Sequence, residues 1–378
     1  MSSPVELPTI EAIEVFRVVV PLLEPLRVWG RAIDKRELIF VRARAGGHIG
    51  AGYALSRGLA LDAVVSRQIA PGVIGKSSGE MRAIWNAARA TTRMTGGDGV
   101  FARALSLVDL ALWDLYGRVL GAPLWRIWGG AQSSVPCLAI CGYYRTGSAS
   151  GDWRADSTAA LKGEAERLCA AGYTRFKIPV GEDSALDAER VRLLRAIAGP
   201  AAQIGVDASG VFDTLKDAEA AIRTLAAAGI DFFEDPFPVS EWLRATTLAA
   251  HSDMRIAYGE SITSTAIMQQ LCGPGGVDIA RPDVTVLGGP TGFVQAIAPA
   301  LEHNLLLFPH YYPDLHAPLA GAFGRMMVEE SPDAADTVGF GVLRAAQPVI
   351  TGGTWQLAER PGFGIVWDDD AIARFRTA

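Results

Sequence analysis

The amino-acid sequence predicts an α/β protein in which a closed barrel of parallel strands follows a smaller N-terminal α+β domain. From residue 135 onward, short apolar runs typical of strands alternate with Ala-rich amphipathic segments typical of helices. Roughly seven or eight such units close into a (β/α) barrel. Polar residues also recur where the apolar runs end, and in a parallel barrel these strand ends surround one mouth.

The first part of the chain has the pattern of an antiparallel sheet followed by helices. Residues 10–20 read as a strand, residues 26–36 as a loop rich in Arg, Lys and Trp, and residues 36–54 as a hairpin divided by Gly46–Gly47. Helical spacing without strand-like runs follows. We therefore expect an α+β domain over residues 1–130.

The strongest predicted helix lies at the end of this region and leads into the barrel. Its apolar residues recur at steps of three and four, at Ala104, Leu107, Leu110, Ala111, Leu115 and Val119. Gly121–Pro123 ends it. The candidate strands that follow are VPCLAIC, RFKIPV, QIGVDA, IDFFED, RIAYGE, DIARPD and LLLFPH. We expect the barrel over residues 131–350, and a C-terminal segment over 351–378 that returns to the first domain.

Composition and charge narrow the class of protein. Hydrophobic residues make up 49% of the chain and charged residues 20%, the balance of a soluble globular protein. The net charge of −6 argues against a nucleic-acid partner, and no apolar run is long enough to cross a membrane. The N-terminus lacks the pattern of a secretory signal, and the four cysteines form no CxxC pair. We expect a cytoplasmic protein with buried free thiols.

Five polar residues follow the apolar runs at a regular interval of roughly 25 residues, the length of one strand–helix unit. They are Asp207, Glu234, Glu260, Asp283 and His310. A single acid in such a place is usually a loop cap or a member of a surface ion pair. Three acids at matching strand ends favour convergence on one pocket instead. Their mutual repulsion would be removed by a divalent cation, and carboxylate ligands suit Mg²⁺.

His310 and Asp283 would lie on neighbouring strands. A carboxylate that accepts the Nδ1–H of a histidine fixes its tautomer and makes the other ring nitrogen a better base. His316 is a weaker candidate in a segment with helical character. A metal site beside a base suits proton abstraction from the carbon α to a carboxylate, with the enediolate oxygens stabilised by the cation.

Several segments together resemble one known family. They are ARALSLVDLALWDLYGRVLGAPLWRIWGG, AGYTRFKIPVG, IGVDASG, FFEDPFP, YGES, RPDVTVLGG, FPH and ERPGFGIVWD. Their order and spacing resemble the enolase superfamily, specifically its mandelate racemase-like branch of acid-sugar dehydratases and racemases. The resemblance covers nearly the whole chain. It implies a TIM-type barrel of the modified (β/α)7β kind with an N-terminal capping domain.

The resemblance also implies roles for individual residues. The metal ligands, for one Mg²⁺ per subunit, would be Asp207, Glu234 and Glu260. The acid/base dyad would be His310 and Asp283. The substrate would be a small carboxylate, and the protein would be a homo-oligomer.

Substrate contacts are implied less directly. Glu329, in a segment before the last strand region, would match a carboxylic acid that hydrogen-bonds the substrate carboxylate. The capping loop around Trp29 and Arg31 would close over the substrate and exclude water. Tyr144 follows the first barrel strand and is a further candidate contact.

One departure from the family pattern bears on mechanism. The family usually has Lys-x-Lys in the second barrel strand, whereas this chain has Lys177–Ile178–Pro179. Residues two apart face the same side of a strand, so Pro179 stands where a second base would be. Lys177 would contact the substrate carboxylate or form a salt bridge with a neighbouring acid. A second departure is Ser209, where Asn is common.

The residues favour a dehydratase of an acid sugar or related hydroxy acid, because one base suffices for elimination. Racemisation requires a base on each face of the carbon, so a racemase or epimerase is the runner-up. A non-catalytic barrel that binds a ligand is a third reading, supported by the missing lysine and opposed by the intact acids and dyad.

Overall fold

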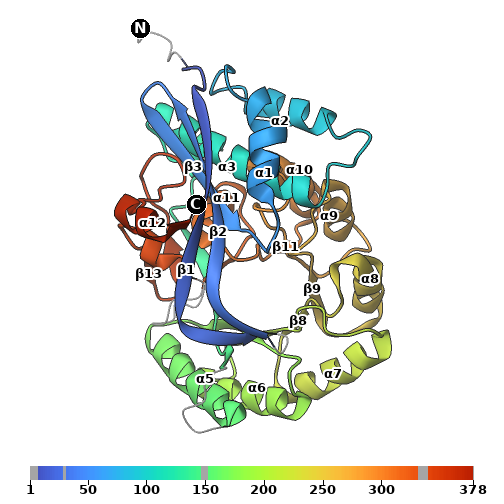
Figure 1. The fold of residues 1–378 in the computed structure, drawn as a ribbon. Helices are drawn as coiled ribbons and strands as arrows, with labels where there is room; N and C mark the ends of the chain where they lie inside the picture. Colours follow the sequence, from blue (N-terminus) through green and yellow to red (C-terminus); the bar gives the residue numbers. More distant parts are fainter. Residues whose placement is uncertain (1–6, 29–30, 146–151, 331–338, 378) are drawn as a thin grey trace.

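The computed structural model describes residues 7–28, 31–145, 152–330 and 339–377. Figure 1 shows a ring of strands and helices beside a long, twisted sheet formed by the N-terminal residues. These parts contain two separate hydrogen-bonded sheets, one antiparallel and one mainly parallel. The arrangement confirms the predicted barrel with an N-terminal α+β domain.

The antiparallel sheet is built from β1 (Ala12–Val28), β2 (Arg31–Ala45) and β3 (His48–Leu55). The ladder between β1 and β2 continues past one register shift in β1 to the tip of the hairpin. The loop predicted over residues 26–36 is therefore wrong, because most of these residues pair as strand. Trp29 lies outside the described residues.

The turn between β2 and β3 confirms the predicted hairpin. Gly46 and Gly47 have φ of 55° and 78°, a left-handed conformation that glycine adopts without steric cost. Helix α3 (Val100–Val119) packs against β3 so closely that a Cβ at Gly50 would come 2.2 Å from the carbonyl oxygen of Ala111. This close contact fixes how far α3 stands from the sheet.

The remaining helices of this region are short. They are α1 (Leu61–Val64), the π-helix Val65–Ile69, the 3-10 turn Ala70–Gly72, α2 (Met81–Ala90) and α4 (Leu124–Ile127). The apolar positions that predicted α3 are buried, except the half-buried Val119. The helix ends before Gly121, as predicted.

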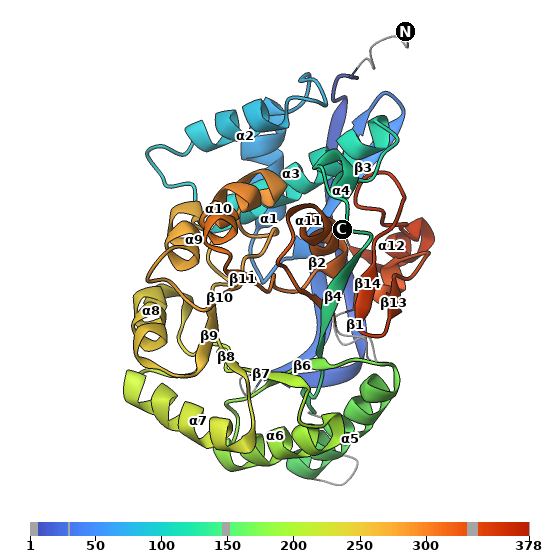
Figure 2. The same ribbon diagram turned by 180° about the vertical axis from the view of Figure 1, so that it is seen from behind.

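Eight parallel strands form the barrel within the described part of the chain (Figure 2). They are β4 (Ser134–Ile140), β6 (Arg175–Pro179), β7 (Gln203–Asp207), β8 (Phe232–Glu234), β9 (Arg255–Tyr258), β10 (Ile279–Ala280), β11 (Leu306–Leu307) and β12 (Val328–Glu330). β12 pairs with β4, and an isolated parallel bridge between Leu307 and Met326 joins β11 to the residues before β12.

Seven helices connect these strands among the residues described, which is the (β/α)7β order. They are α5 (Trp153–Ala170), α6 (Ser184–Ala198), α7 (Leu215–Ala228), α8 (Trp242–His251), α9 (Thr265–Cys272), α10 (Gly289–His303) and α11 (Pro313–Phe323). β12 is absent from the seven strands that the sequence predicted. Glu329 therefore lies in the last barrel strand, not before it.

The C-terminal residues contact both parts of the molecule. β13 (Val349–Thr351) and β14 (Thr354–Gln356) form a hairpin that pairs with β4, whereas α12 (Asp369–Phe375) leads to β15 (Arg376–Thr377), which pairs with β1. The division at residues 130 and 350 stays a prediction. No disulfide joins any of the four cysteines, all of which lie in the described part of the chain. Among the described residues, no helix combines the length and the apolar character needed to cross a membrane.

Candidate active site

Three acids meet where adjacent barrel strands end. Asp207 ends β7 and pairs in register with Glu234, which ends β8, and Glu260 follows β9 by two residues. One carboxylate oxygen from each of the three lies within 4.8 Å of the others. Parallel strands bring their carboxyl ends to one edge, which is why residues far apart in sequence converge here.

These carboxylates have the chemistry that a Mg²⁺ ion requires. Oε2 of Glu234 is buried and accepts no hydrogen bond from any described residue, so it is available as a ligand. The backbone amide and hydroxyl of Ser209 donate to Oδ1 of Asp207 at 2.8 and 2.9 Å and orient that carboxylate. All-oxygen ligation by a few carboxylates, with positions left for water and substrate, suits Mg²⁺. Ser209, which stands where Asn is usual in the family, thus orients Asp207, one of the three candidate metal ligands.

Two buried cations lie against the acids. Nζ of Lys177 is 2.6 Å from both Glu234 and Glu329, and Nη2 of Arg281 is 3.0 Å from Glu234 and 2.7 Å from Glu329. Lys177 is therefore placed in the salt bridges that the sequence suggested as one of its two alternatives. Its contact with a substrate carboxylate stays a prediction.

The groups of the acid cluster that form ion pairs carry a net negative charge. Its ionisable members are two cations and four carboxylates: Lys177, Arg281, Asp207, Glu234, Glu260 and Glu329. With all six ionised, 2 − 4 = −2, a charge that one divalent cation cancels. Burial raises the pKa of Glu234 and of Glu260, and neighbouring carboxylates add to both shifts. A bound cation would favour the ionised forms instead.

Glu329 lies deep in the cluster. Burial opposes its ionisation, but the charges of Arg281 and Lys177 outweigh burial and lower its pKa to about 2. Its Oε2 also accepts a hydrogen bond from the backbone amide of Tyr311 at 3.1 Å. Glu329 thus anchors the segment that follows His310, while its proposed contact with substrate stays a prediction.

His310 and Asp283 form the predicted pair. Nδ1 of His310 lies 2.9 Å from Oδ2 of Asp283, and the amide and hydroxyl of Thr285 both donate to Oδ1 at 2.7 Å. The other ring nitrogen, Nε2, is 3.4 Å from Oε2 of Glu260. The imidazole therefore points its free nitrogen toward the acid cluster.

The surroundings keep this imidazole neutral. Burial lowers the pKa of His310 well below its ordinary value, and the positive charge of Arg57 lowers it further. Burial raises the pKa of Asp283 to about 7, against the hydrogen bonds from Thr285. A neutral imidazole with one nitrogen held by a carboxylate can accept a proton at the other. In α11, Nε2 of His316 instead accepts a hydrogen bond from the backbone amide of Val284.

Of the predicted contact residues, Tyr144 is not brought to the acid cluster, whereas the structure does not describe the side chains of Trp29 and Arg31. Tyr144 belongs to β5 (Tyr144–Arg145), and its hydroxyl donates a hydrogen bond to Asp187. The guanidinium of Arg190 lies 4.1 Å from the centre of its ring, so the buried side chain of Tyr144 packs against α6. Trp29 lies outside the described residues. Arg31 begins β2, but its side chain is not described.

Further residues lie beside the site, and one of them, Tyr143, is also suggested by the sequence as a substrate contact because it follows the first barrel strand. Tyr143 and Tyr311 hydrogen-bond through their hydroxyls, and the ring of Tyr311 lies 4.6 Å from that of His310. Arg57 and Arg103, from the N-terminal domain, act electrostatically on Asp283. The position of Tyr143 after a strand marks it in the sequence, whereas no local pattern marks the two arginines.

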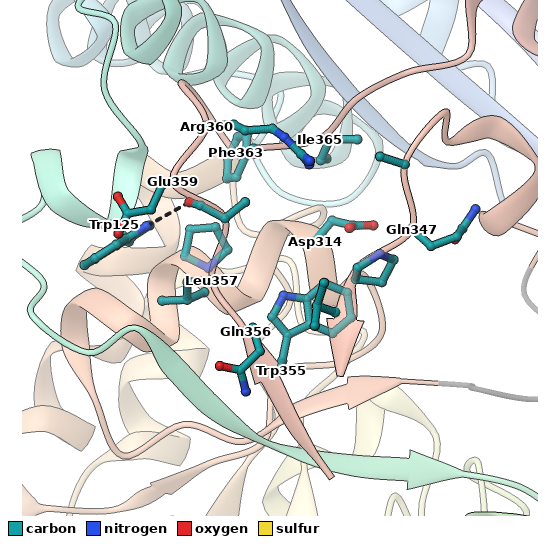
Figure 3. A pocket seen from close by; sticks show the side chains of 16 residues that line it. Trp125, Asp314, Gln347, Trp355, Gln356, Leu357, Glu359, Arg360, Phe363 and Ile365 are labelled. Carbon is teal, nitrogen blue, oxygen red and sulfur yellow. Dashed lines mark hydrogen bonds between the residues drawn. The ribbon is translucent and has the colours of Figure 1, made fainter. Parts of the chain in front are cut away.

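A separate cavity of about 350 Å³ lies where the C-terminal segment meets the barrel (Figure 3). Nε1 of Trp125 donates to the carbonyl of Ala358 at 3.1 Å, and Asp314 pairs with Arg344. None of the clustered acids lines this cavity. It belongs to the packing of the C-terminal segment and not to the candidate site.

Comparison with known families matches both parts of the chain. Residues 11–129 match the family described as "Mandelate racemase / muconate lactonizing enzyme, N-terminal domain". Residues 160–371, more than half of the chain, match the family described as "Enolase C-terminal domain-like". Both matches agree with the observed fold.

Individual relatives and solved structures extend this result. A 3,6-anhydro-alpha-L-galactonate cycloisomerase from Streptomyces coelicolor is 30% identical over 345 residues, which is 89% of this chain and 91% of the relative. A putative L-rhamnonate dehydratase from Caldivirga maquilingensis is 27% identical over 82% of this chain and 76% of its own length. The crystal structure of a racemase from Streptomyces coelicolor with bound magnesium is 27% identical, with a TM-score of 0.86 over 97% of this chain and 100% of that one. The chain is therefore an enzyme of the enolase superfamily and belongs to its mandelate racemase-like subgroup.

Proposed function

We propose that this enzyme is a Mg²⁺-dependent dehydratase of an acid sugar or a related hydroxy acid, and that its product is a 2-keto-3-deoxy acid. The observation that carries the proposal is that, among the described residues, His310 is the candidate base at the acid cluster and Pro179 stands where a second would be expected. His310 is held by Asp283 and faces Glu260, while Pro179 pairs in register with Asp207 where a second base would stand. Dehydratases among the relatives, including an arabinonate dehydratase from Saccharolobus solfataricus, support the reaction class.

In this mechanism Nε2 of His310 removes the proton from the carbon α to the substrate carboxylate. Asp283 accepts the Nδ1–H, which fixes the tautomer and stabilises the imidazolium that forms. Asp207, Glu234 and Glu260 would hold the Mg²⁺ ion, which would supply positive charge beside the carboxylate of the substrate where negative charge develops. The imidazolium then returns its proton to the β-hydroxyl, which leaves as water. The electron pair left by the α-proton forms a double bond between the α-carbon and the β-carbon. The resulting enol tautomerises to the 2-keto-3-deoxy acid.

The residues of β6 oppose a second base on the other face. Proline has no group that transfers a proton, and Lys177, two residues earlier on the same face, is bound to Glu234 and Glu329. An elimination in which one histidine first accepts and then donates the proton needs no further base. The geometry therefore favours elimination over racemisation.

The proposal is tested by incubating the purified enzyme with a panel of aldonic and aldaric acids. We expect at least one acid to lose one water, detected by mass spectrometry and as a 2-keto acid. Activity should disappear with EDTA and return with Mg²⁺. If the protein binds Mg²⁺ but converts no acid in a wide panel, the proposed substrate class is wrong.

A cycloisomerase is the second candidate, because the relative at 30% identity carries that name. An isomerase leaves the mass of its substrate unchanged, so mass spectrometry separates it from a dehydratase. Exchange of the α-hydrogen with solvent deuterium, without loss of water, would instead favour a racemase or epimerase.

A further inference from the structure

Two tyrosines at the barrel mouth hydrogen-bond each other and have no role in the mechanism above. Tyr143 lies in the loop after β4, and Tyr311 directly follows the proposed base, His310. Their hydroxyl groups are bonded to each other, and the centre of the Tyr311 ring lies 4.6 Å from that of the His310 imidazole. Tyr143 is buried and Tyr311 is half-buried. We refer to Tyr143 and Tyr311 as the tyrosine pair.

The tyrosine pair lies across the barrel mouth from the candidate metal ligands. β12 stands between β11 and β4, because it pairs with β4 and because Met326, just before it, bridges to Leu307 of β11. The bond between Tyr311, after β11, and Tyr143, after β4, therefore joins the two strands that flank β12. In the ring of eight strands, β12 is four strands from β8 through β9, β10 and β11, and also four through β7, β6 and β4. β8 carries Glu234, the middle one of the three candidate ligands.

Two buried cations connect these opposite sides. Lys177 and Arg281 each contact Glu234 of β8 and Glu329 of β12. Oε2 of Glu329 also accepts a hydrogen bond from the backbone amide of Tyr311 at 3.1 Å. A ligand in the mouth would therefore have the candidate metal site on one side and the tyrosine pair on the other.

The rings of the tyrosine pair are held by apolar contacts. Tyr143 belongs to a small buried cluster with Leu22 and Leu26 of β1 and Ile140 of β4, and Tyr311 packs against this cluster. Tyr311 has φ of 50°, a left-handed conformation that is uncommon for a residue other than glycine. Such a conformation persists where the surrounding contacts maintain it. These contacts fix the two hydroxyl groups at one place in the mouth.

The tyrosine pair has one more proton than its own hydrogen bond uses. Each phenolic hydroxyl carries one proton and can both donate and accept. Whichever hydroxyl donates to the other, the second keeps a proton for which no described residue is an acceptor. Burial raises the pKa of Tyr143 well above its ordinary value, so its hydroxyl stays protonated. One O–H donor is therefore available to a ligand.

We infer that the tyrosine pair donates a hydrogen bond to the β-hydroxyl of the substrate and holds this oxygen beside His310 while it leaves. This inference rests on the proposed function. With the substrate carboxylate at the candidate metal ligands and the α-carbon in reach of His310, the β-carbon extends toward the opposite side of the mouth. The leaving oxygen takes the proton that His310 removed from the α-carbon, and both tyrosines keep their own protons. The hydrogen bond favours departure of the hydroxyl as water without adding a proton to the reaction.

The kinetic test removes the hydroxyl groups and keeps the rings. The double variant Tyr143→Phe/Tyr311→Phe should lower kcat for dehydration at least about tenfold with a smaller change in KM, because the hydrogen bond strengthens as the oxygen leaves. Each single variant should lose less, since the remaining hydroxyl keeps its proton. Tyr116→Phe, on α3, is the matched control and should leave kcat unchanged, because its hydroxyl bonds no described residue. Circular dichroism and Mg²⁺ titration check folding and metal affinity.

A binding measurement separates this role from a purely structural one. In a His310→Asn background, which stops turnover, calorimetry with Mg²⁺ compares the acid that the wild type dehydrates with its 3-deoxy analogue, which lacks only the β-hydroxyl. The acid should bind at least about threefold more tightly, the scale of one neutral hydrogen bond. Adding Tyr143→Phe and Tyr311→Phe should remove this preference. A loss of support for the loop alone would weaken the binding of both ligands equally.

Two results would overturn the inference and leave the dehydratase proposal standing. One is a double variant whose kcat stays within about twofold of the wild type. The other is that the preference for the acid over its 3-deoxy analogue is absent in His310→Asn, or survives both tyrosine substitutions. Failure of the wild type to dehydrate any acid would instead reject the proposed function, and the role of the tyrosine pair with it.

Discussion

The two sides of the candidate active site hold their positive charges differently. On the barrel side, Lys177 and Arg281 are almost fully buried, and each lies within 4.0 Å of three carboxylates. On the side of the N-terminal domain, Arg57 and Arg103 lie that close to no carboxylate among the described residues. The cationic side chains therefore form ion pairs with carboxylates on the barrel side, and on the side of the N-terminal domain they form none with a described residue.

This difference separates two requirements of the enzyme. A buried cation without a partner is very unfavourable, so Lys177 and Arg281 are tied to the acids that also form the candidate metal site. The charges of Arg57 and Arg103 are compensated by no ion pair with a described residue, although burial opposes the charge of both.

The largest effect should follow from removing the proposed base. His310→Asn should lower kcat by about 10²–10⁴-fold with little change in Mg²⁺ affinity, because general base catalysis contributes on that scale. Steady-state kinetics and metal titration measure both quantities. His303→Asn, at an exposed position on α10, is the matched control. A residual rate within tenfold of the wild type would reject His310 as the base.

The next effect concerns stability on the barrel side. Arg281→Gln removes one partner of Glu234 and Glu329 and leaves buried carboxylates without compensation, so we expect a loss of about 3–5 kcal/mol in the free energy of unfolding. Urea denaturation measures it, with and without Mg²⁺. A loss below about 1 kcal/mol would show that this charge is not integrated into the fold.

A third prediction concerns a buried carboxylate that has no cation. Asp109, on α3, accepts hydrogen bonds from the amide and hydroxyl of Thr291 at 2.8 and 2.9 Å, and burial raises its pKa from 3.8 to about 7. Because the folded protein holds this proton more tightly than the unfolded chain, the stabilisation is fully present below pH 3.8 and is lost as the pH rises through 7.

Asp109→Asn should remove this contribution. The variant should therefore gain stability relative to the wild type between pH 5 and 8, by at most about 4 kcal/mol, since one pKa unit corresponds to about 1.4 kcal/mol. Urea midpoints at several pH values measure the difference. A difference that does not change with pH would mean that Asp109 is ionised throughout this range.

The smallest expected effect completes the comparison. Arg57→Gln should change the free energy of unfolding by no more than about 0.5 kcal/mol, because no bound partner is lost. The same urea experiment measures it beside Arg281→Gln. A decrease in the free energy of unfolding as large as that of Arg281→Gln would mean that Arg57 stabilises the fold as much as Arg281 does.

The barrel and its metal-ligand candidates could be predicted from the sequence because both depend on a repeat. Each strand–helix unit places its strand end at the same mouth, so the spacing of Asp207, Glu234 and Glu260 is enough to bring them together. The pairing of His310 with Asp283 follows from the same rule. β12 was missed because only three residues, Val328–Glu330, form it, and its polar end resembles a loop.

Features that depend on how the domains dock could not be predicted in this way. Arg57 and Arg103 lie 46 positions apart (103 − 57 = 46) in unrelated elements, and they share a neighbourhood only because α3 and β3 pack over the barrel loops. The side chain of Tyr144 turns toward Asp187 because its backbone pairs with β1. Neither arrangement leaves a local pattern in the sequence.

The hydrogen bond from Leu55 to Tyr312 has a consequence for how such enzymes can be recombined. Tyr311 and Tyr312, directly after His310, both have positive φ, and their loop is held by Glu329 from the barrel and by Leu55 from the N-terminal domain. Because the donor is a backbone amide, a barrel joined to the N-terminal domain of a relative would keep this support only if that domain placed an amide at the same position. Substrate preference is therefore best redesigned within the native N-terminal domain, at single positions, and not by exchanging that domain as a module.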